Sequence, residues 1–143
     1  MLSNKTKVCI LGGEITWDSV NSAIRELYDI VLNNKKYTTL VLFIHSPGGD
    51  TDAAWSLYTT LKNIPLKIIT VANGRVYSAA TIIFLAGSSR IAYKESIFLF
   101  HPATITTSNN EERALYQIKE DLNGEQFDKG QFRKILKQFS PVV

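Results

Sequence analysis

Ser78 is the residue of this chain whose surroundings best suit nucleophilic chemistry. It lies in the segment Gly74–Ala80, where small residues follow it at the predicted start of a helix. A serine at this position is most often an N-cap. It can also act as a nucleophile, because the N–H of the next residue, Ala79, can donate to a developing oxyanion. The second interpretation requires a base within hydrogen-bond reach, since serine alone is a weak nucleophile.

Two histidines could supply that base. His101 ends the apolar run Phe98–Phe100 and precedes Pro102, which stops a strand. A histidine in this position is usually structural, but the polar loop that follows lets the imidazole border a cleft. His45 is the rival base, and it stands on the strand that should carry an oxyanion loop. We therefore favour His101 as the general base.

The segment Ser46–Gly49, with sequence Ser-Pro-Gly-Gly, predicts a tight turn after a strand. Proline fixes its own φ, and paired glycines adopt backbone conformations that are closed to other residues. Without a Cβ in the way, the backbone N–H groups can face outward, toward a substrate or an oxyanion. The alternative is an ordinary strand-to-helix turn with no chemical role.

Alternating strands and helices must position these residues. Apolar, β-branched runs predict strands, and apolar stripes at helical spacing predict helices. The order β-α-β-α-β-α-β-β-α is typical of an α/β layered fold with mainly parallel strands, whose sites collect at the carboxyl ends of strands. The predicted strands are Lys7–Leu11, Thr39–Ile44, Lys67–Val71, Arg90–Tyr93 and Ser96–Phe100. The predicted helices begin at a cap on Thr16 or Asp18, at Asp52, at Ser78 and at Asn110.

Composition limits the classes of protein to which the chain can belong. The chain has 143 residues, of which 45% are hydrophobic and 20% charged, and this profile indicates one globular domain. The net charge of +3 is dispersed, and the C-terminal basic cluster at helical spacing is interpreted as a solvated helix face, not as a nucleic-acid site. The longest apolar runs are too short to span a bilayer.

Cys9 is the single cysteine, so no intrachain disulfide can form. Its apolar neighbours predict a buried strand residue, and a catalytic thiol is the minor alternative because no activating base is implied nearby. A lone cysteine without a signal peptide suits a reducing compartment, and we expect a cytoplasmic protein.

Together, these motifs resemble the proteolytic subunit of the Clp protease, within the crotonase-like superfamily. The matching segments are Val8–Ile15, Ile44–Gly49, Gly74–Ala79 and Phe100–Pro102, in that order. Their separations fit the family, with a slight shortening between Ser78 and His101. The resemblance covers nearly the whole chain.

The resemblance implies an α/β, ClpP/crotonase-like layered fold of repeated β-β-α/β-α units with a C-terminal handle helix. The chain would be a single peptidase domain over residues 1–143. Ser78 matches the nucleophile, His101 the general base, and Gly49 and Ala79 the backbone donors of the oxyanion hole. Gly48, Gly49 and Pro102 are expected to contact the substrate. The resemblance implies no metal and no cofactor.

The implied partners are a peptide or unfolded protein substrate and further copies of the chain. Thr104–Asn110 and the helix after it match the handle, through which rings of subunits pair, and the substrate would bind there as an added strand. A homo-oligomeric ring is therefore expected. The family's axial loops find no counterpart before the first strand, so docking to an ATPase unfoldase is less expected.

One element of the family pattern finds no match. The family's triad aspartate lies beyond the handle helix, and the sequence ends at Val143 before such a segment, so we expect a chain shortened at its C-terminus. The available acids fall in the handle-like helix, which should point away from the site: Glu120, Asp121, Glu125 and Asp128. Losing the third member of a triad costs orders of magnitude in rate, so weak activity is expected.

Three functions follow as hypotheses. The first is a serine endopeptidase that forms an acyl-enzyme on Ser78. The second is a catalytically weak or inactive subunit that acts in assembly. The third is a crotonase-like enzyme acting on acyl-CoA thioesters, against which the presence of both Ser78 and His101 argues. A Ser–Lys pair, as in signal peptide peptidases, would have to use Lys94, whose predicted turn position is unpromising.

Overall fold

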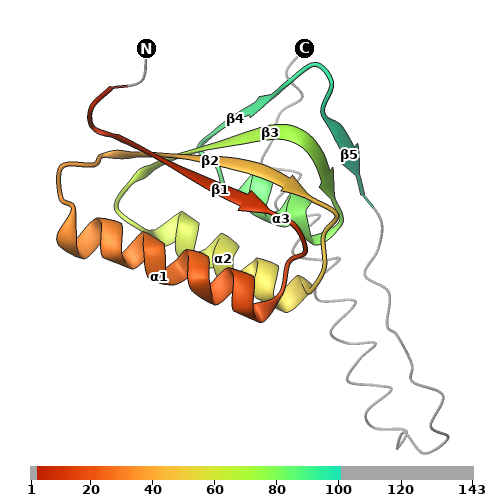
Figure 1. Cartoon of the computed structure of the whole chain (residues 1–143), viewed down its shortest axis with the longest axis horizontal. Coiled ribbons are helices and arrows are strands. Elements are labelled where there is room, and N and C mark those ends of the chain that lie inside the picture. The colour runs from red at the N-terminus through yellow and green to blue at the C-terminus, as the bar shows by residue number, and fades with distance from the viewer. Residues whose placement is uncertain (1–2, 101–143) are drawn as a thin grey trace, which may run out of the picture. The chain divides into compact units, whose positions relative to one another are not determined.

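The computed structural model describes residues 3–100, which lie in the compact unit Met1–Phe100 (Figure 1). The predicted handle helix, His101 and Pro102 lie outside the described residues, and the single domain over residues 1–143 stays a prediction. The strands are β1 (Thr6–Gly12), β2 (Thr39–Ser46), β3 (Lys67–Tyr77), β4 (Ser89–Ala92) and β5 (Ile97–Leu99). The helices are α1 (Trp17–Asn33), α2 (Thr51–Asn63) and α3 (Ala79–Leu85). Over residues 3–100 the predicted order of elements is confirmed.

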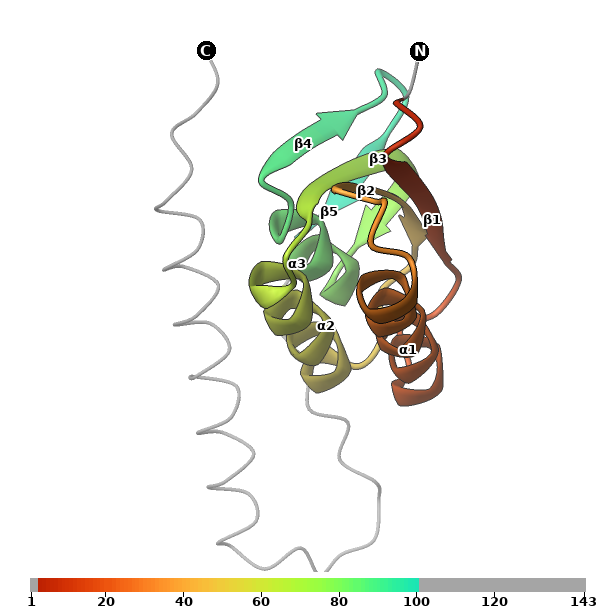
Figure 2. The same ribbon diagram turned by 90° about the vertical axis from the view of Figure 1, so that its left-hand side faces the viewer.

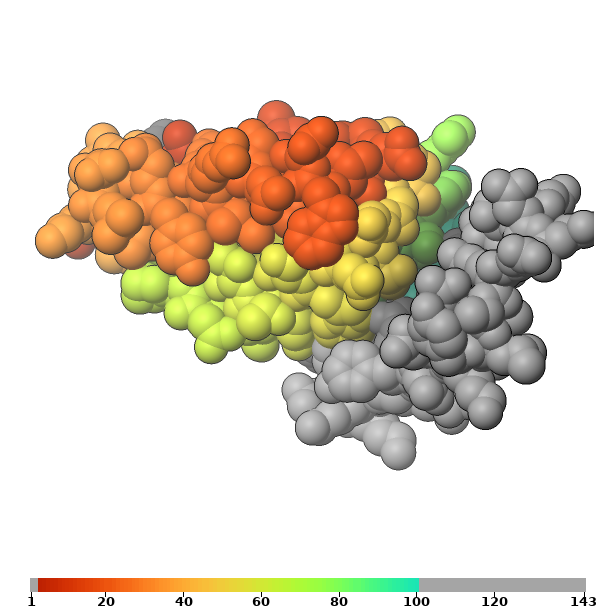
Figure 3. Space-filling model, turned by 90° about the horizontal axis from the view of Figure 1, so that it is seen from below, coloured from red at the N-terminus to blue at the C-terminus, as the bar shows by residue number. Residues whose placement is uncertain are grey.

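The strands form one sheet in the order β1-β2-β3-β4, and β5 pairs with the far end of β3. Every pairing within residues 3–100 is parallel, which confirms the prediction of a mainly parallel sheet. Each helix connects one strand to the neighbouring strand, and the chain moves across the sheet in one direction from β1 to β4. Connections of the same handedness therefore place α1, α2 and α3 on one face of the sheet (Figures 1 and 2). α1 and α2 form a continuous layer when that face is viewed directly (Figure 3). None of the helices within residues 3–100 has the length and apolar character needed to cross a bilayer.

Local signals explain where α1 and α2 begin. Thr16 is the N-cap of α1 and forms a reciprocal capping box with Ser19: the Ser19 N–H donates to Thr16 Oγ1 (3.1 Å), and the Thr16 N–H donates to Ser19 Oγ (3.0 Å). Asp50 caps α2, and its Oδ1 accepts from the Ala53 N–H at 2.9 Å. The buried residues of the two helices follow the apolar stripes predicted from the sequence: Val20, Leu27, Ile30, Ala53, Ala54, Leu57 and Leu61.

The central strand β2 is buried along most of its length, as its continuous apolar run predicts. β1 differs because it forms an edge of the sheet. Leu11 is buried toward the helices, whereas Val8 and Ile10, on the opposite face, are 41% and 76% exposed. Cys9 lies on a strand, as predicted, but it is half-buried and not fully buried, because β1 lies at the edge of the sheet.

β3 is longer than predicted. The sequence predicted a strand that ends at Val71, before the glycine at position 74. In the structure the strand continues to Tyr77 through an irregularity, where the register against β2 shifts between Ile44 and Ser46. The extra length carries the chain directly to Ser78.

Candidate functional site

Ser78 follows the last residue of β3 and precedes the first residue of α3. Its backbone has φ 51° and ψ −124°, and it is the one non-glycine residue with positive φ within residues 3–100. Hydrogen bonds hold this strained turn on both sides. The Ser78 N–H donates to the Leu99 carbonyl (2.8 Å), and the Ser78 carbonyl accepts from the Thr81 N–H (2.9 Å) and the Thr81 hydroxyl (2.6 Å). A strained residue held this firmly between a strand and a helix is the backbone arrangement of a nucleophile elbow.

The hydroxyl of Ser78 does not cap α3. Ser78 occupies the N-cap position, yet its side chain makes no capping hydrogen bond. The structural interpretation of this serine as a side-chain cap is therefore wrong. The reason is the backbone conformation, because a capping residue normally has an extended backbone that turns its oxygen toward the helix. Ser78 is half-buried.

The Ser46–Gly49 turn lies directly against Ser78. Gly48 has φ 93°, and a Cβ built on it would approach the Tyr77 carbonyl oxygen to 2.6 Å and the Ser78 Cβ to 2.8 Å. The same Cβ would lie 3.2 Å from the Ala79 nitrogen. The two turns therefore touch backbone to backbone, at adjacent carboxyl ends of β2 and β3, and only glycine fits at position 48.

Ile15 anchors this turn from the other side. The Ile15 N–H donates to the Gly48 carbonyl (2.8 Å), and the Asp50 N–H donates to the Ile15 carbonyl (2.8 Å). This pattern makes a parallel bridge between Ile15 and Gly49, and Ile15 is 1% exposed. Sequence reasoning gave Ile15 no role. The Gly12-Gly13 pair just before it could have indicated this role, because it ends β1 and brings the chain back to the end of β2.

Two backbone N–H groups near Ser78 have no acceptor among residues 3–100. The N–H groups of Gly49 and Ala79 donate no hydrogen bond to any residue within 3–100. Unpaired N–H groups at a turn and at the first residue of a helix can bind an anionic oxygen. The structure thus brings Gly48 close to Ser78 and Ala79, and it places Gly49 next in the chain. The assignment of oxyanion donors remains a prediction.

Ser46 fixes the glycine turn from within, and its loss has a predictable effect. Ser46 is fully buried, and its Oγ accepts from the Gly48 N–H at 3.0 Å. We expect Ser46→Ala to lower the free energy of unfolding by about 1–2 kcal/mol, because the Gly48 N–H loses a buried acceptor. Urea unfolding measures this loss. Ser22→Ala, on the exposed face of α1, is the control and should change stability by less than about 0.5 kcal/mol. Equal effects of the two substitutions would contradict this role of Ser46.

His45, the rival base, has a defined position near the end of β2. Its Nδ1 accepts a hydrogen bond from the Arg75 N–H at 3.3 Å. His101 and Pro102 lie outside the described residues, so their predicted roles stay predictions. Lys94 lies in the exposed turn between β4 and β5, as the sequence predicted.

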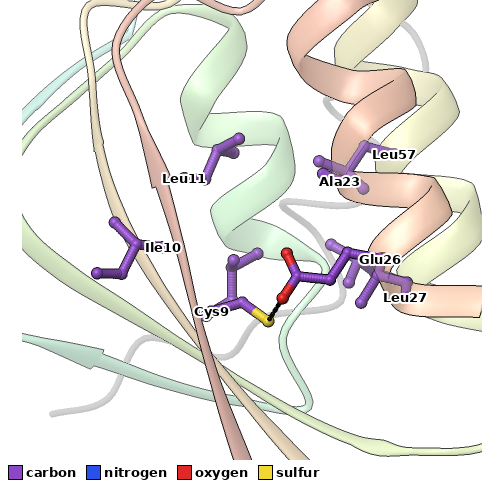
Figure 4. Close-up of a pocket in the computed structure, with 9 residues that line it drawn as sticks. Cys9, Ile10, Leu11, Ala23, Glu26, Leu27 and Leu57 are labelled. Carbon is purple, nitrogen blue, oxygen red and sulfur yellow. Dashed lines mark hydrogen bonds between the residues drawn. The ribbon is translucent and has the colours of Figure 1, made fainter. Parts of the chain in front are cut away.

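Cys9 lies in a different part of the molecule, in a small cavity between β1 and the helices (Figure 4). The cavity is about 30 Å³ and is lined mainly by leucines. The Cys9 Sγ is 3.4 Å from Glu26 Oε1, toward which it donates. Burial, and then the nearby Glu26 carboxylate, raise the pKa of the Cys9 thiol to about 12. The thiol is therefore protonated at neutral pH, and this environment does not activate a nucleophile.

The raised pKa of Cys9 predicts slow alkylation and a loss of stability in alkali. At neutral pH we expect iodoacetamide to react with Cys9 at least about tenfold more slowly than with an unfolded control peptide. Above about pH 9, an unfolded chain loses the thiol proton while the folded chain keeps it, so the free energy of unfolding falls as pH rises toward 12. Urea unfolding across this range measures the effect. Cys9→Ala should reduce the slope, and an unchanged slope would contradict the proposed cause.

The model of the family described as Clp protease matches residues 1–126. A curated relative, the ATP-dependent Clp protease proteolytic subunit 2 of Treponema pallidum, is 28% identical over 100 residues, which are 68% of this chain and 49% of the relative. The subunit of the same name from Treponema denticola is 33% identical over 99 residues, which are 67% of this chain and 48% of the relative. The chain spans about half the length of these relatives.

A solved structure is similar over most of this chain. The ClpP1 N165D mutant from Listeria monocytogenes superposes with a TM-score of 0.73 at 18% identity, and the match covers 92% of this chain and 70% of that chain. At this identity the likeness bears on the fold alone. It agrees with the predicted layered α/β fold with a mainly parallel sheet.

Proposed function

Since the chain belongs to the Clp protease family, we propose that it is a serine peptidase that hydrolyses peptide bonds through an acyl-enzyme on Ser78. The observation that carries the proposal is the conformation of Ser78. A non-glycine residue with positive φ costs free energy, which the fold offsets with three hydrogen bonds to its backbone. The Ser78 side chain makes no capping bond, so helix capping does not explain why the residue adopts this conformation.

The neighbouring backbone supports an oxyanion hole. The N–H groups of Gly49 and Ala79 donate to no described residue, and Gly48 packs against Ser78 with no room for a side chain. Two such donors, held rigidly before substrate arrives, stabilise the negative oxygen of a tetrahedral intermediate and need no reorganisation in the transition state. The carbonyl oxygen of the substrate would accept from these donors, and its carbonyl carbon would face Ser78 Oγ.

His101 is the proposed general base. It follows Leu99 by two residues, and the Leu99 carbonyl accepts from the Ser78 N–H. This closeness in sequence, together with the family resemblance, is what supports the choice of His101. In the proposed cycle His101 takes the Ser78 proton as Oγ attacks the peptide carbonyl. It then protonates the leaving amine, and it activates the water that hydrolyses the ester.

Peptide or unfolded protein segments are the proposed substrates, with contacts to Gly48, Gly49 and Pro102. We also propose that the protein assembles as a homo-oligomeric ring through the segment after His101. The matched relatives are named as proteolytic subunits of an ATP-dependent protease. An ATPase partner for this chain and a cytoplasmic location are further proposals, and nothing among the described residues bears on either.

A fluorophosphonate probe tests the proposal, because it reacts with activated serines by the same attack that opens peptide hydrolysis. We expect mass spectrometry of the folded protein to find one adduct, on Ser78. His101→Ala should slow labelling by on the order of 10³-fold without unfolding the protein. A folded protein whose Ser78 stays unmodified would overturn the proposal and favour an assembly subunit. Binding of CoA, measured by calorimetry, would instead favour the acyl-CoA alternative.

A further inference from the structure

His45 sits against an irregularity in β3. Between Ala72 and Val76, β3 has three residues, whereas β2 has only His45 between Ile44 and Ser46. The imidazole of His45 accepts the Arg75 N–H on Nδ1, at 3.3 Å. This bond requires an unprotonated Nδ1, since a protonated ring nitrogen can only donate.

The imidazole also lies on the backbone of Gly74. Gly74 has φ 155°, and a Cβ built there would fall 2.1 Å from His45 Nδ1 and 2.7 Å from Cε1. No other residue type fits beneath the ring. The imidazole of His45 therefore occupies the space that a side chain at position 74 would need.

This irregularity sets how the two turns of the candidate site meet. Beyond it, Val76 pairs with Ser46, and β3 curves away to pair with β5 (Figure 1). Gly48 follows Ser46 by two residues, and Ser78 follows Val76 by two residues. A change in the register of β3 against β2 at the irregularity would therefore shift the turn at Ser78 relative to the Ser46–Gly49 turn. Gly48 and Ser78 are in close contact and tolerate no such shift.

We propose that His45 is a positioning residue, whose Nδ1 holds the Arg75 N–H and thereby fixes Ser78 against the Gly48–Gly49 turn. This inference rests on the proposed function, which assigns the chemistry to Ser78. It gives His45 a role other than general base. Its imidazole acts through the backbone of β3 and does not accept the proton of Ser78.

Amide variants of His45 separate these roles. The Oδ1 of asparagine can occupy the position of Nδ1, whereas the Oε1 of glutamine reaches toward the position of Nε2. We expect His45→Asn to keep fluorophosphonate labelling of Ser78 within about twofold of the parent, and His45→Ala and His45→Gln to slow it about tenfold, the loss expected of one hydrogen bond. A general base would show equal losses in all three variants, and that result would overturn the proposal.

Hydrogen exchange of the Arg75 amide gives a readout that does not depend on catalysis. We expect exchange to accelerate about tenfold in His45→Ala and to return toward the parent rate in His45→Asn. If labelling fails in every variant while exchange follows this pattern, the proposed function fails and the positioning contact stands. An Arg75 amide that exchanges equally fast in the parent and in His45→Ala would overturn the inference by itself.

A double-mutant cycle tests the contact with Gly74. In the parent, Gly74→Ala forces its Cβ into the imidazole and should reduce labelling strongly. In the His45→Ala background the collision is absent, so the same substitution should reduce labelling at least about fivefold less. Equal effects in both backgrounds would overturn the proposed fit between the ring and the glycine.

Discussion

Replacement of Ser78 with alanine is expected to abolish fluorophosphonate labelling and to lower hydrolysis of a fluorogenic peptide by on the order of 10⁴-fold or more. The physical reason is that Oγ supplies the bond-forming electron pair, and no neighbouring group can replace it. The fold should survive, because Ser78 holds its turn through backbone atoms, and its side chain makes no capping bond. The measurement is initial rate against substrate concentration, together with urea unfolding.

Ser22→Ala is the matched control for this substitution, because it removes one exposed serine hydroxyl from α1. It should leave both labelling and hydrolysis unchanged. Hydrolysis that persists in purified Ser78→Ala at the parent rate would exclude Ser78 as the nucleophile. Parent protein that is folded, unlabelled and inactive would instead favour an assembly subunit.

Replacement of Gly48 with alanine is expected to damage both stability and activity. The new Cβ would have to enter space held by the Tyr77 carbonyl and the Ser78 Cβ, at 2.6 and 2.8 Å. Strained φ and the collision together should lower the free energy of unfolding by about 2–5 kcal/mol. Labelling of Ser78 should fall at least about 100-fold, because the glycine turn and the serine turn are forced apart. Urea unfolding and labelling kinetics measure the two effects.

Gly13→Ala separates strain from collision. Gly13 also has positive φ, 81°, but a Cβ there meets no atom within 4 Å. It should therefore cost about 1–2 kcal/mol from backbone strain alone, and labelling should stay near the parent rate. If Gly48→Ala lowers stability and labelling no more than Gly13→Ala does, the close contact between the two turns contributes to neither.

Much of the fold follows from local patterns in the sequence. Apolar stripes predicted α1 and α2 closely, and the cap on Thr16 was predicted too, because helix ends depend on nearby residues. The cap of α2 on Asp50 was not predicted, and that helix begins at Thr51, one residue before the predicted Asp52. Burial of β2 was also predictable, since a continuous apolar run needs cover on both faces. The partial exposure of Cys9 was not, because it depends on β1 lying at an edge of the sheet.

Part of the candidate site could likewise be predicted from the sequence. Residue types and order alone singled out Ser78 and the Ser46–Gly49 turn, because the chemistry of a nucleophile and the backbone freedom of glycine are properties of single residues. The pairing with His101 rests on the same evidence and stays a prediction.

The tertiary structure decided what lies between those motifs. The sequence predicted that the strand ends at Val71, but β3 continues to Tyr77 because pairing with β2 and β5 accommodates the extra residues. The sequence could not tell that the Ser78 side chain makes no capping bond, because this depends on the φ of Ser78, a residue whose backbone bonds to Leu99 and Thr81. Such long-range pairings have no local signature. The sequence therefore singled out Ser78 as a candidate, and the sheet around it set its strained conformation.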